Sequence, residues 1–202
     1  MDVVSYFEPI NFKDQCWRNF SLDCGELQKK WHKNWSEKGW NPIFLNEEYA
    51  RKHHALNSID IDDFKSNLYK DANDPNYAKQ CYLRWFAYCR FAEINNGAHW
   101  SDYDVYNCSL RPKAQKHSKL YSKSGCAGYM SQKTSRVLIQ NIFKFSKNQF
   151  PLEPIPSCHD MQIVQKTFRE NYGQDFHDDI TSGFRDSKYD YQLYHLHGGV
   201  IL

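Results

Sequence analysis

The first half of the chain alternates short apolar runs with apolar residues at helical spacing. Residues 3–7 (VVSYF) are rich in β-branched and aromatic side chains and stop just before a proline, which predicts a first strand. A helix is predicted over residues 23–38, where large apolar residues recur at four-residue spacing: Leu27, Trp31 and Trp35. Gly39 follows directly and is typical of a helix C-terminus.

A second strand and a second, longer helix continue the pattern. Residues 41–46 (NPIFLN) are an apolar run between turn-forming residues, which predicts a strand. Residues 73–97 predict the clearest helix, because Asp74 can cap it, Pro75 is tolerated in a first turn and Gly97 can close it. We expect its buried stripe to consist of Tyr77, Cys81, Trp85, Cys89 and Ala92.

A third strand is predicted to begin directly after this helix, in the stretch AHWSDYDVYN (98–107). The order strand, helix, strand, helix, strand predicts an α/β, Rossmann-like fold with a mainly parallel central sheet flanked by helices. The second half is less regular, with strand and turn expected over 120–132 and helices over 133–147 and 160–172. The length of 202 residues fits one domain over 1–202.

Composition and charge narrow the functional classes. The formal net charge is only +2, which argues against nucleic acid as a partner. The seven cysteines are spread singly without a CxxC motif, which indicates a reducing compartment and hence the cytoplasm. The first residues show no signal peptide, and no window reaches the length of a transmembrane helix.

Two aspartates near the end of the predicted third strand are the strongest chemical signal. Asp102 and Asp104 are two positions apart, so in an extended segment they face the same side. Convergent carboxylates need a positive charge between them, and Mg²⁺ and Mn²⁺ accept such oxygen ligands. In open α/β sheets ligands bind beyond the carboxyl ends of strands, where this pair lies. The alternative is an acidic turn with solvated charges.

The sequence around this pair resembles that of glycosyltransferases of the GT-A fold. Residues 82–105, YLRWFAYCRFAEINNGAHWSDYDV, are similar to the family stretch in which a helical Arg, a Gly-containing turn and a strand ending in D-x-D follow one another. The matching residues are Arg84, Gly97, Asp102 and Asp104. The family usually has two glycines at the turn, whereas this chain has NNGAHW. The resemblance covers residues 1–107 and implies a GT-A-like domain.

This resemblance implies a site that holds Mn²⁺ or Mg²⁺ with the diphosphate of a nucleotide sugar. Asp104 is the expected direct ligand, and Asp102 is expected to touch the metal or the ribose. Arg84 is expected near the donor's phosphates or ribose, the alternative being a surface Arg on an amphipathic helix. Near the C-terminus, YHLHGG is similar to a family segment that brings a late His to the metal, so His195 is an expected ligand and His197 the fallback.

The remaining expected contacts lie on the first strand and on a late helix. The resemblance places Ser5, Tyr6 and Phe7 at the floor of the nucleotide pocket, although ordinary core packing explains the two aromatics equally well. The resemblance makes Asp160 the candidate catalytic base or acceptor-holding residue, and an N-cap role is the commoner explanation for such an Asp. Lesser candidates are His159, Asp178, Asp179 and Asp186.

The resemblance therefore implies a glycosyltransferase that moves sugar from a UDP- or GDP-sugar to a hydroxyl of a glycan or other acceptor. Residues 1–107 are expected to bind the donor, and residues 108–202 are expected to form the acceptor side with the metal-binding tail. The alternatives are another two-carboxylate metal enzyme, such as a nuclease or phosphotransferase, and a non-catalytic sugar- or nucleotide-binding protein of the same fold.

Overall fold

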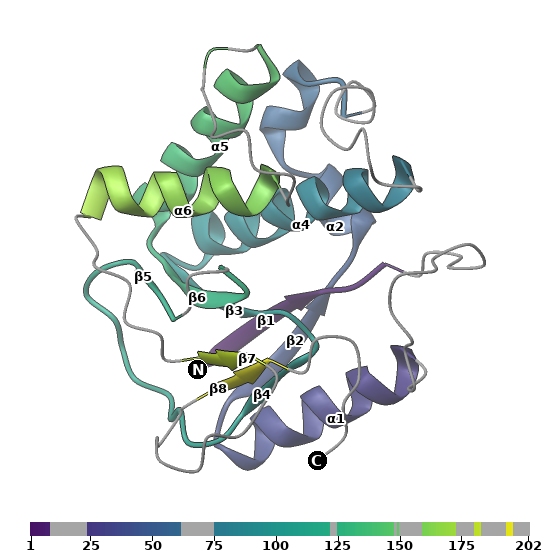
Figure 1. The fold of residues 1–202 in the computed structure, drawn as a ribbon, viewed down its shortest axis with the longest axis vertical. Helices are drawn as coiled ribbons and strands as arrows, with labels where there is room; N and C mark the ends of the chain where they lie inside the picture. The colour runs from purple at the N-terminus through teal and green to yellow at the C-terminus, as the bar shows by residue number, and fades with distance from the viewer. Residues whose placement is uncertain are drawn as a thin grey trace.

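The computed structural model shows an α/β fold built on a five-stranded sheet (Figure 1). It describes residues 1–8, 24–61, 75–121, 125–147, 149, 159–172, 180–182 and 193–195. The sheet strands are β1 (Asp2–Tyr6), β2 (Asn41–Leu45), β3 (Ala98–Ser101), β5 (Lys119–Leu120) and β6 (Ala127–Met130). The helices are α1 (Cys24–Glu37), α2 (Glu47–Arg51), the 3-10 helix η1 (His54–Ser58), α4 (Pro75–Ile94), α5 (Gln132–Ser146) and α6 (His159–Tyr172).

The sheet is mixed, with strand order β2-β1-β3-β6-β5. β1 runs parallel to both β2 and β3, as the alternating pattern predicted. β6 is antiparallel to β3 and to β5, so the expected parallel arrangement holds only for the first three strands. No described helix separates β3 from β6 or β5 from β6, and antiparallel pairs need no helical crossover. The α/β fold class is therefore confirmed, and its sheet is parallel only in part.

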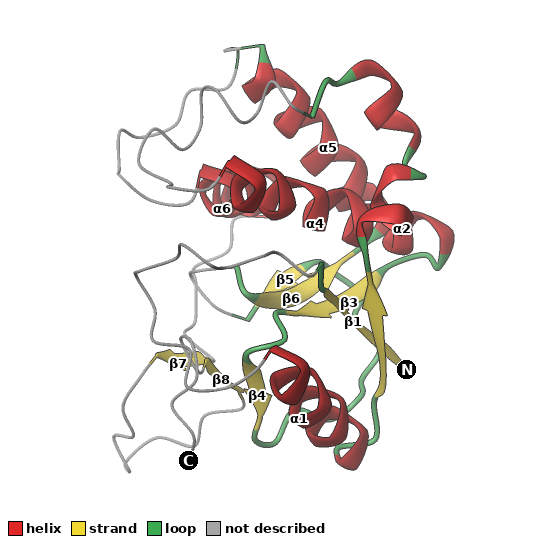
Figure 2. Cartoon of the chain, turned by 90° about the vertical axis from the view of Figure 1, so that its right-hand side faces the viewer, coloured by secondary structure: helices red, strands yellow, loops and turns green. Residues whose placement is uncertain are grey.

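Helices cover both faces of this sheet (Figure 2). Helix α1 packs on one face, where Val3, Trp31, Trp35 and Trp40 belong to one buried apolar cluster. The opposite face carries α4, with α2, α5 and α6 around it, and its larger cluster includes Val4. Neighbouring residues of β1 therefore point into opposite cores, as the two-residue period of a strand requires.

Helix α4 is buried on more sides than its predicted stripe. Four of the five expected positions are buried: Cys81, Trp85, Cys89 and Ala92. The side chain of the fifth, Tyr77, lies outside the described residues. The residues between them are buried as well, including Tyr82, Leu83, Phe86 and Tyr88, because the helix lies between the sheet and the other helices. None of the helices in the described part of the chain is both long and apolar enough to span a membrane.

The stretch that contains the two aspartates is not one extended strand. β3 ends at Ser101, and a turn follows in which the Val105 N–H donates to the Asp102 carbonyl at 3.0 Å. The chain then enters β4 (Val105–Asn107) of a second sheet, with the order β4-β8-β7. The other two strands of that sheet are β7 (Ile180–Ser182) and β8 (Leu193–His195). The expected i, i+2 alignment of Asp102 and Asp104 is therefore wrong, because a turn rotates the backbone between them.

Candidate active site at the end of β3

The sheet reverses its winding between β1 and β3. From β1 the chain passes through α1 to β2 on one side, and it then returns through α4 to β3 on the other side of β1. In open α/β sheets ligands bind at such a switch point, beyond the carboxyl ends of the two strands. Phe7 follows β1 and Asp102 follows β3 at this edge. The predicted placement of Asp102 beyond a strand's carboxyl end is thus confirmed.

Three residues that the sequence singled out separately meet here around the guanidinium of Arg84. Arg84 Nη1 donates to Asp102 Oδ1 at 3.0 Å, and Arg84 Nη2 donates to Asp160 Oδ2 at 2.7 Å. The side chains of Arg84 and Asp102 are each 14% exposed, and that of Asp160 is 1% exposed. The ion triad therefore joins the end of β3, the middle of α4 and the first turn of α6 within one largely buried cluster.

The charges of this triad support one another. Burial alone lowers the pKa of the Arg84 guanidinium, but the charges of Asp102 and Asp160 hold it well above its usual value. Tyr88 lies nearby on α4, and its hydroxyl accepts a hydrogen bond from the Tyr6 N–H at 3.0 Å. Burial and then the charge of Asp102 raise the pKa of Tyr88. The arrangement therefore places a permanent cation and a neutral phenol beside the Asp102 carboxylate.

Asp160 is oriented by two donors. Trp85 Nε1 donates to Asp160 Oδ2 at 2.9 Å, and the same oxygen accepts from Arg84. The Arg84 guanidinium also lies over the Trp85 ring, 5.0 Å from its centroid. Asp160 is the second residue of α6, and its carboxylate faces α4 in the interior. Such full engagement suits an anchor for Arg84 better than a base exposed to an acceptor.

Helix α1 holds the turn from the opposite face. Trp31 Nε1 donates to Ser101 Oγ at 3.3 Å, and Trp35 Nε1 donates to the Val105 carbonyl at 3.1 Å. Asn34 Nδ2 donates to the Asn107 carbonyl, and Asn34 Oδ1 accepts from the Asn107 N–H. The apolar spacing predicted the two tryptophans as packing residues but gave no role to Asn34. The signal that could have indicated Asn34 is a polar residue three positions after Trp31, on the apolar face of the helix.

Asp104 lies in the turn itself and is partly buried. The tail strand β8 pairs antiparallel with β4, and the backbone of His195 lies opposite Val105. The backbone of His195, the predicted metal-binding His, thus lies beside Val105, the residue that directly follows Asp104. The side chain of His195 and the whole of His197 lie outside the described residues. Their predicted role as metal ligands remains a prediction.

The three predicted residues of the first strand differ in their surroundings. Ser5 is fully buried in the sheet, and Tyr6 is 6% exposed with its hydroxyl donating to Gln80 Oε1. Phe7 is partly exposed at the carboxyl edge, where its ring meets that of Tyr103 edge-to-face at 5.5 Å between centroids. The aromatic rings of Phe7 and Tyr103 therefore contact each other between β1 and the aspartate turn. Of Ser5, Tyr6 and Phe7, only Phe7 has a side chain exposed enough to contact a ligand.

The turn carries side chains of the type that a hard divalent cation prefers as ligands. Asp102 and Asp104 supply carboxylate oxygens, which Mg²⁺ and Mn²⁺ prefer, and the nearby backbone of β8 brings an imidazole-bearing residue to the same turn. Asp102 Oδ1 is already bonded to Arg84, so a cation at this turn would share Asp102 with the guanidinium. The chemistry of these residues therefore suits a metal-bound diphosphate, whose negative charge both cations would stabilise.

Another group of ligand-type atoms lies between η1 and the end of α4. Suitable atoms of His53, His54 and Glu93 lie within 4.8 Å of one another. However, His53 Nδ1 accepts from the Ala55 N–H, so the neutral ring carries its proton on Nε2, which faces Glu93 Oε2 at 3.7 Å. The two imidazoles are also stacked, 4.7 Å apart, so their lone pairs do not converge. This geometry fits an electrostatic contact rather than a metal site.

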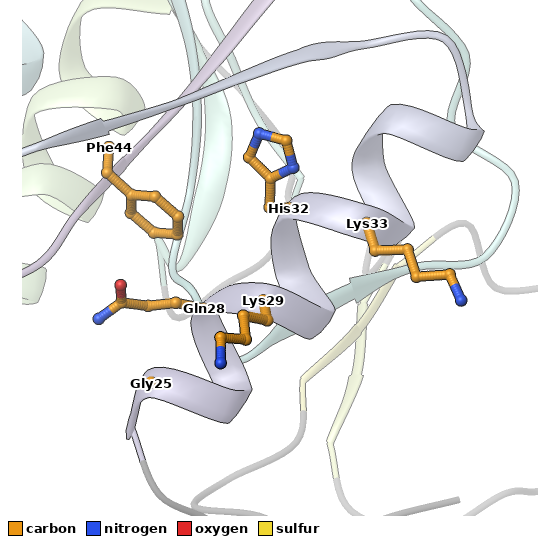
Figure 3. A pocket seen from close by; sticks show the side chains of 6 residues that line it. All are labelled: Gly25, Gln28, Lys29, His32, Lys33 and Phe44. Carbon is orange, nitrogen blue, oxygen red and sulfur yellow. The ribbon is translucent and has the colours of Figure 1, made fainter.

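A shallow open pocket of about 410 Å³ lies between α1 and β2 (Figure 3). Its lining residues are Gly25, Gln28, Lys29, His32, Lys33 and Phe44. None of the residues predicted for the site belongs to this lining. The pocket is therefore separate from the Arg84 cluster.

Several lesser candidates stay untested. Asp178, Asp179, Asp186 and the side chain of His159 lie outside the described residues.

No protein-family model, curated protein or solved structure matches the chain.

Proposed function

We propose that this chain is a metal-dependent glycosyltransferase with a GT-A-like domain. In this proposal it transfers sugar from a nucleotide diphosphate sugar, UDP- or GDP-linked, to a hydroxyl of a glycan or related acceptor. The observation that carries the proposal is the meeting of Arg84, Asp102 and Asp160 at the switch point of the sheet. Ligands of α/β sheets bind at this position, and the residues there suit an anionic, metal-bound ligand.

The chemistry follows from the charges at the turn. Breaking a sugar–phosphate bond leaves new negative charge on the diphosphate, and a bound Mn²⁺ or Mg²⁺ supplies electrostatic stabilisation of that charge. Asp102 and Asp104 would hold the cation, with His195 or His197 as a further ligand. Arg84 adds a permanent positive charge beside Asp102. Phe7 and Tyr103 offer aromatic surface on which a nucleoside can pack.

Asp160 takes a different role from the one that its sequence position suggested. Its carboxylate is buried and accepts from both Arg84 and Trp85. We therefore assign it as a positioning residue, which keeps the Arg84 guanidinium directed at Asp102. The proton acceptor for an incoming hydroxyl is then expected to come from another residue or from the substrate.

Isothermal titration calorimetry tests the proposal directly. The wild-type chain is titrated with UDP, GDP and UDP- and GDP-sugars, each with Mn²⁺ and with a chelator. We expect nucleotide binding that requires the metal, and its loss in Asp104→Asn. Glu48→Gln is the matched control, because it removes one exposed carboxylate on α2 and should leave binding unchanged. Absence of metal-dependent nucleotide binding by the wild type would overturn the proposal.

Slow hydrolysis of the donor sugar distinguishes an enzyme from a binding protein of the same fold. Release of free sugar from the bound UDP- or GDP-sugar supports transfer chemistry, with water acting as a poor acceptor. Binding without any release over many hours supports the non-catalytic alternative. Cleavage of a nucleic acid or of a simple phosphate ester, without nucleotide-sugar binding, supports another two-carboxylate metal enzyme.

A further inference from the structure

Helix α1 makes three side-chain contacts with one short segment of the chain. Trp31, Asn34 and Trp35 occupy positions i, i+3 and i+4, so they share one face of the helix. Each bonds to a different residue of the segment 101–107, which contains both aspartates. We propose that Trp35 and Asn34 are positioning residues that set the location of the aspartate turn. Their role at a donor site rests on the function proposed above.

The contact of Trp35 completes the hydrogen bonding of Val105. The Val105 N–H closes the turn by donating to the Asp102 carbonyl at 3.0 Å, and the Val105 carbonyl accepts from Trp35 Nε1 at 3.1 Å. Both residues are buried, with 1% exposure each. Since Val105 directly follows Asp104, both backbone polar groups of the residue that closes the turn are hydrogen-bonded. Loss of the indole N–H would leave a buried carbonyl without its protein donor.

Asn34 acts in the same way one step further along β4. Its amide donates to the Asn107 carbonyl at 3.0 Å and accepts from the Asn107 N–H at 2.6 Å, as a neighbouring strand would. Backbone groups of residues i and i+2 point to the same edge of a strand, so Val105 and Asn107 both face α1. Tyr106 lies between them and pairs with Tyr194 of β8. One edge of β4 is therefore occupied by side chains of α1 and the other by the tail strand.

The turn is thus held from both faces of the sheet by different means. Helix α1 bonds to its backbone through Trp35, whereas α4 bonds to the Asp102 carboxylate through Arg84. A metal or phosphate site needs ligand positions accurate to a fraction of an ångström, and such accuracy comes from neighbours that lock the ligands. The geometry points to α1 as the element that supplies this accuracy for Asp102 and Asp104.

The simpler explanation is that Trp35 only fills the core. Its ring packs with those of Trp31 and Trp40 in one cluster, and a Phe at position 35 would keep most of that packing. Trp40 offers a matched control, because it is also buried in this cluster and its Nε1 donates to a backbone carbonyl, that of Leu110, at 2.9 Å. Trp35→Phe and Trp40→Phe therefore remove the same atoms and the same type of hydrogen bond. Only Trp35 bonds to the residue that closes the turn, whereas Trp40 bonds to Leu110.

Two measurements on wild type and both variants test the proposal. Hydrogen exchange of peptide 102–107 reports on the turn directly, and calorimetry with UDP and GDP in the presence of Mn²⁺ reports on the donor site. We expect Trp35→Phe to speed exchange in this peptide and to weaken nucleotide binding by about tenfold, the scale of one lost hydrogen bond. Trp40→Phe should leave both readouts within about twofold of the wild type, whatever its effect on thermal stability.

Equal effects of the two variants on exchange would overturn the proposal, and so would unchanged exchange in Trp35→Phe. Altered exchange without altered binding would overturn the role at a donor site. If the wild type binds neither nucleotide with Mn²⁺, the proposed function fails, and the role of Trp35 and Asn34 at a donor site fails with it. The exchange comparison then decides by itself whether Trp35 positions the turn.

Discussion

Arg84 and Asp160 are 76 residues apart in the chain, and their side chains lie 2.7 Å apart in the fold. The same guanidinium bonds to Asp102, so one side chain of α4 connects the aspartate turn to α6. This connection makes Arg84 a structural residue as well as a candidate ligand contact. Stability measurements and binding measurements on the same variants can therefore separate its two roles.

Arg84→Ala should lower the free energy of unfolding by about 3–5 kcal/mol, because it leaves the buried Asp160 carboxylate without its cation. Urea unfolding at neutral pH measures this loss. The double variant Arg84→Ala with Asp160→Asn serves as the control, since it removes both charges of the Arg84–Asp160 pair. It should lose clearly less stability than the sum of its two single variants. Simple additivity would contradict the ion triad.

Gly128→Ala should destabilise the chain by about 1–3 kcal/mol, because a Cβ at position 128 has no room. The added carbon would lie 2.5 Å from Trp100 Cη2 and 2.6 Å from the Lys119 carbonyl oxygen. Since Trp100 lies on β3 two residues before Asp102, we also expect weaker metal-dependent nucleotide binding. Thermal melts and calorimetry measure the two effects.

Gly39→Ala is the comparison for Gly128→Ala. Gly39 has a φ of +89°, but a Cβ there would meet nothing closer than 3.8 Å, the side chain of Pro112. Its substitution should cost about 1–2 kcal/mol of backbone strain and leave nucleotide affinity intact. Equal effects of the two variants on affinity would contradict the steric explanation.

Acid should weaken the fold through His99, which lies buried between Trp40, Tyr121 and Tyr129. Burial, with a smaller effect of the N-terminal amine, lowers the pKa of His99 from 6.5 to about 4. The folded state thus binds its proton less readily than the unfolded state, so the free energy of unfolding falls as pH drops from about 6.5 toward 4. At pH 5 this one group accounts for about 2 kcal/mol.

Urea unfolding of wild type and His99→Gln at pH 7, 6 and 5 measures this linkage. The variant should be less stable at pH 7, since Gln replaces a packed ring, but its stability should change less between pH 7 and 5. His53, whose pKa burial also lowers to about 4, continues to contribute in both proteins. An identical pH dependence in the two proteins would show that His99 is already protonated when folded or is not buried.

Thiol labelling should distinguish the described cysteines. Cys108 is exposed, whereas Cys81, Cys89 and Cys126 are buried, and burial raises the pKa of the Cys89 thiol well above its usual value. Under native conditions we expect iodoacetamide to modify Cys108 at least a hundredfold faster than Cys89, about the ratio that local opening of a core helix imposes. Peptide mass spectrometry measures the two rates. Comparable rates before unfolding would contradict the burial of α4.

Local patterns predicted the elements that pack through a regular apolar stripe. β1, β2, α1 and α4 followed from run length, four-residue spacing and end signals. Helix α2 carried a readable signal as well, because Asn46 caps it by accepting from the Tyr49 N–H and Glu47 bonds to Arg51 one turn later.

The non-local parts of the site had no such signal. A period of two residues predicted an extended Asp102–Asp104 segment, but the Val105 N–H bonds back to Asp102 and makes a turn. The bond between Arg84 and Asp160 joins residues whose local surroundings are unrelated, so each was found separately and their contact was not. Antiparallel β6 was likewise unforeseen, because the direction of a strand depends on connections rather than on its own residues.

The pairing of β4 with β8 also sets the time at which this region can form during synthesis. Val105 pairs with His195, so the ribosome must add about 90 further residues, at roughly 5–20 per second, before β4 meets its partner. During those seconds the nascent chain exposes an unpaired strand edge directly beside the aspartate turn. Chaperones that shield open strand edges would therefore meet this protein at the same place where we expect its substrate.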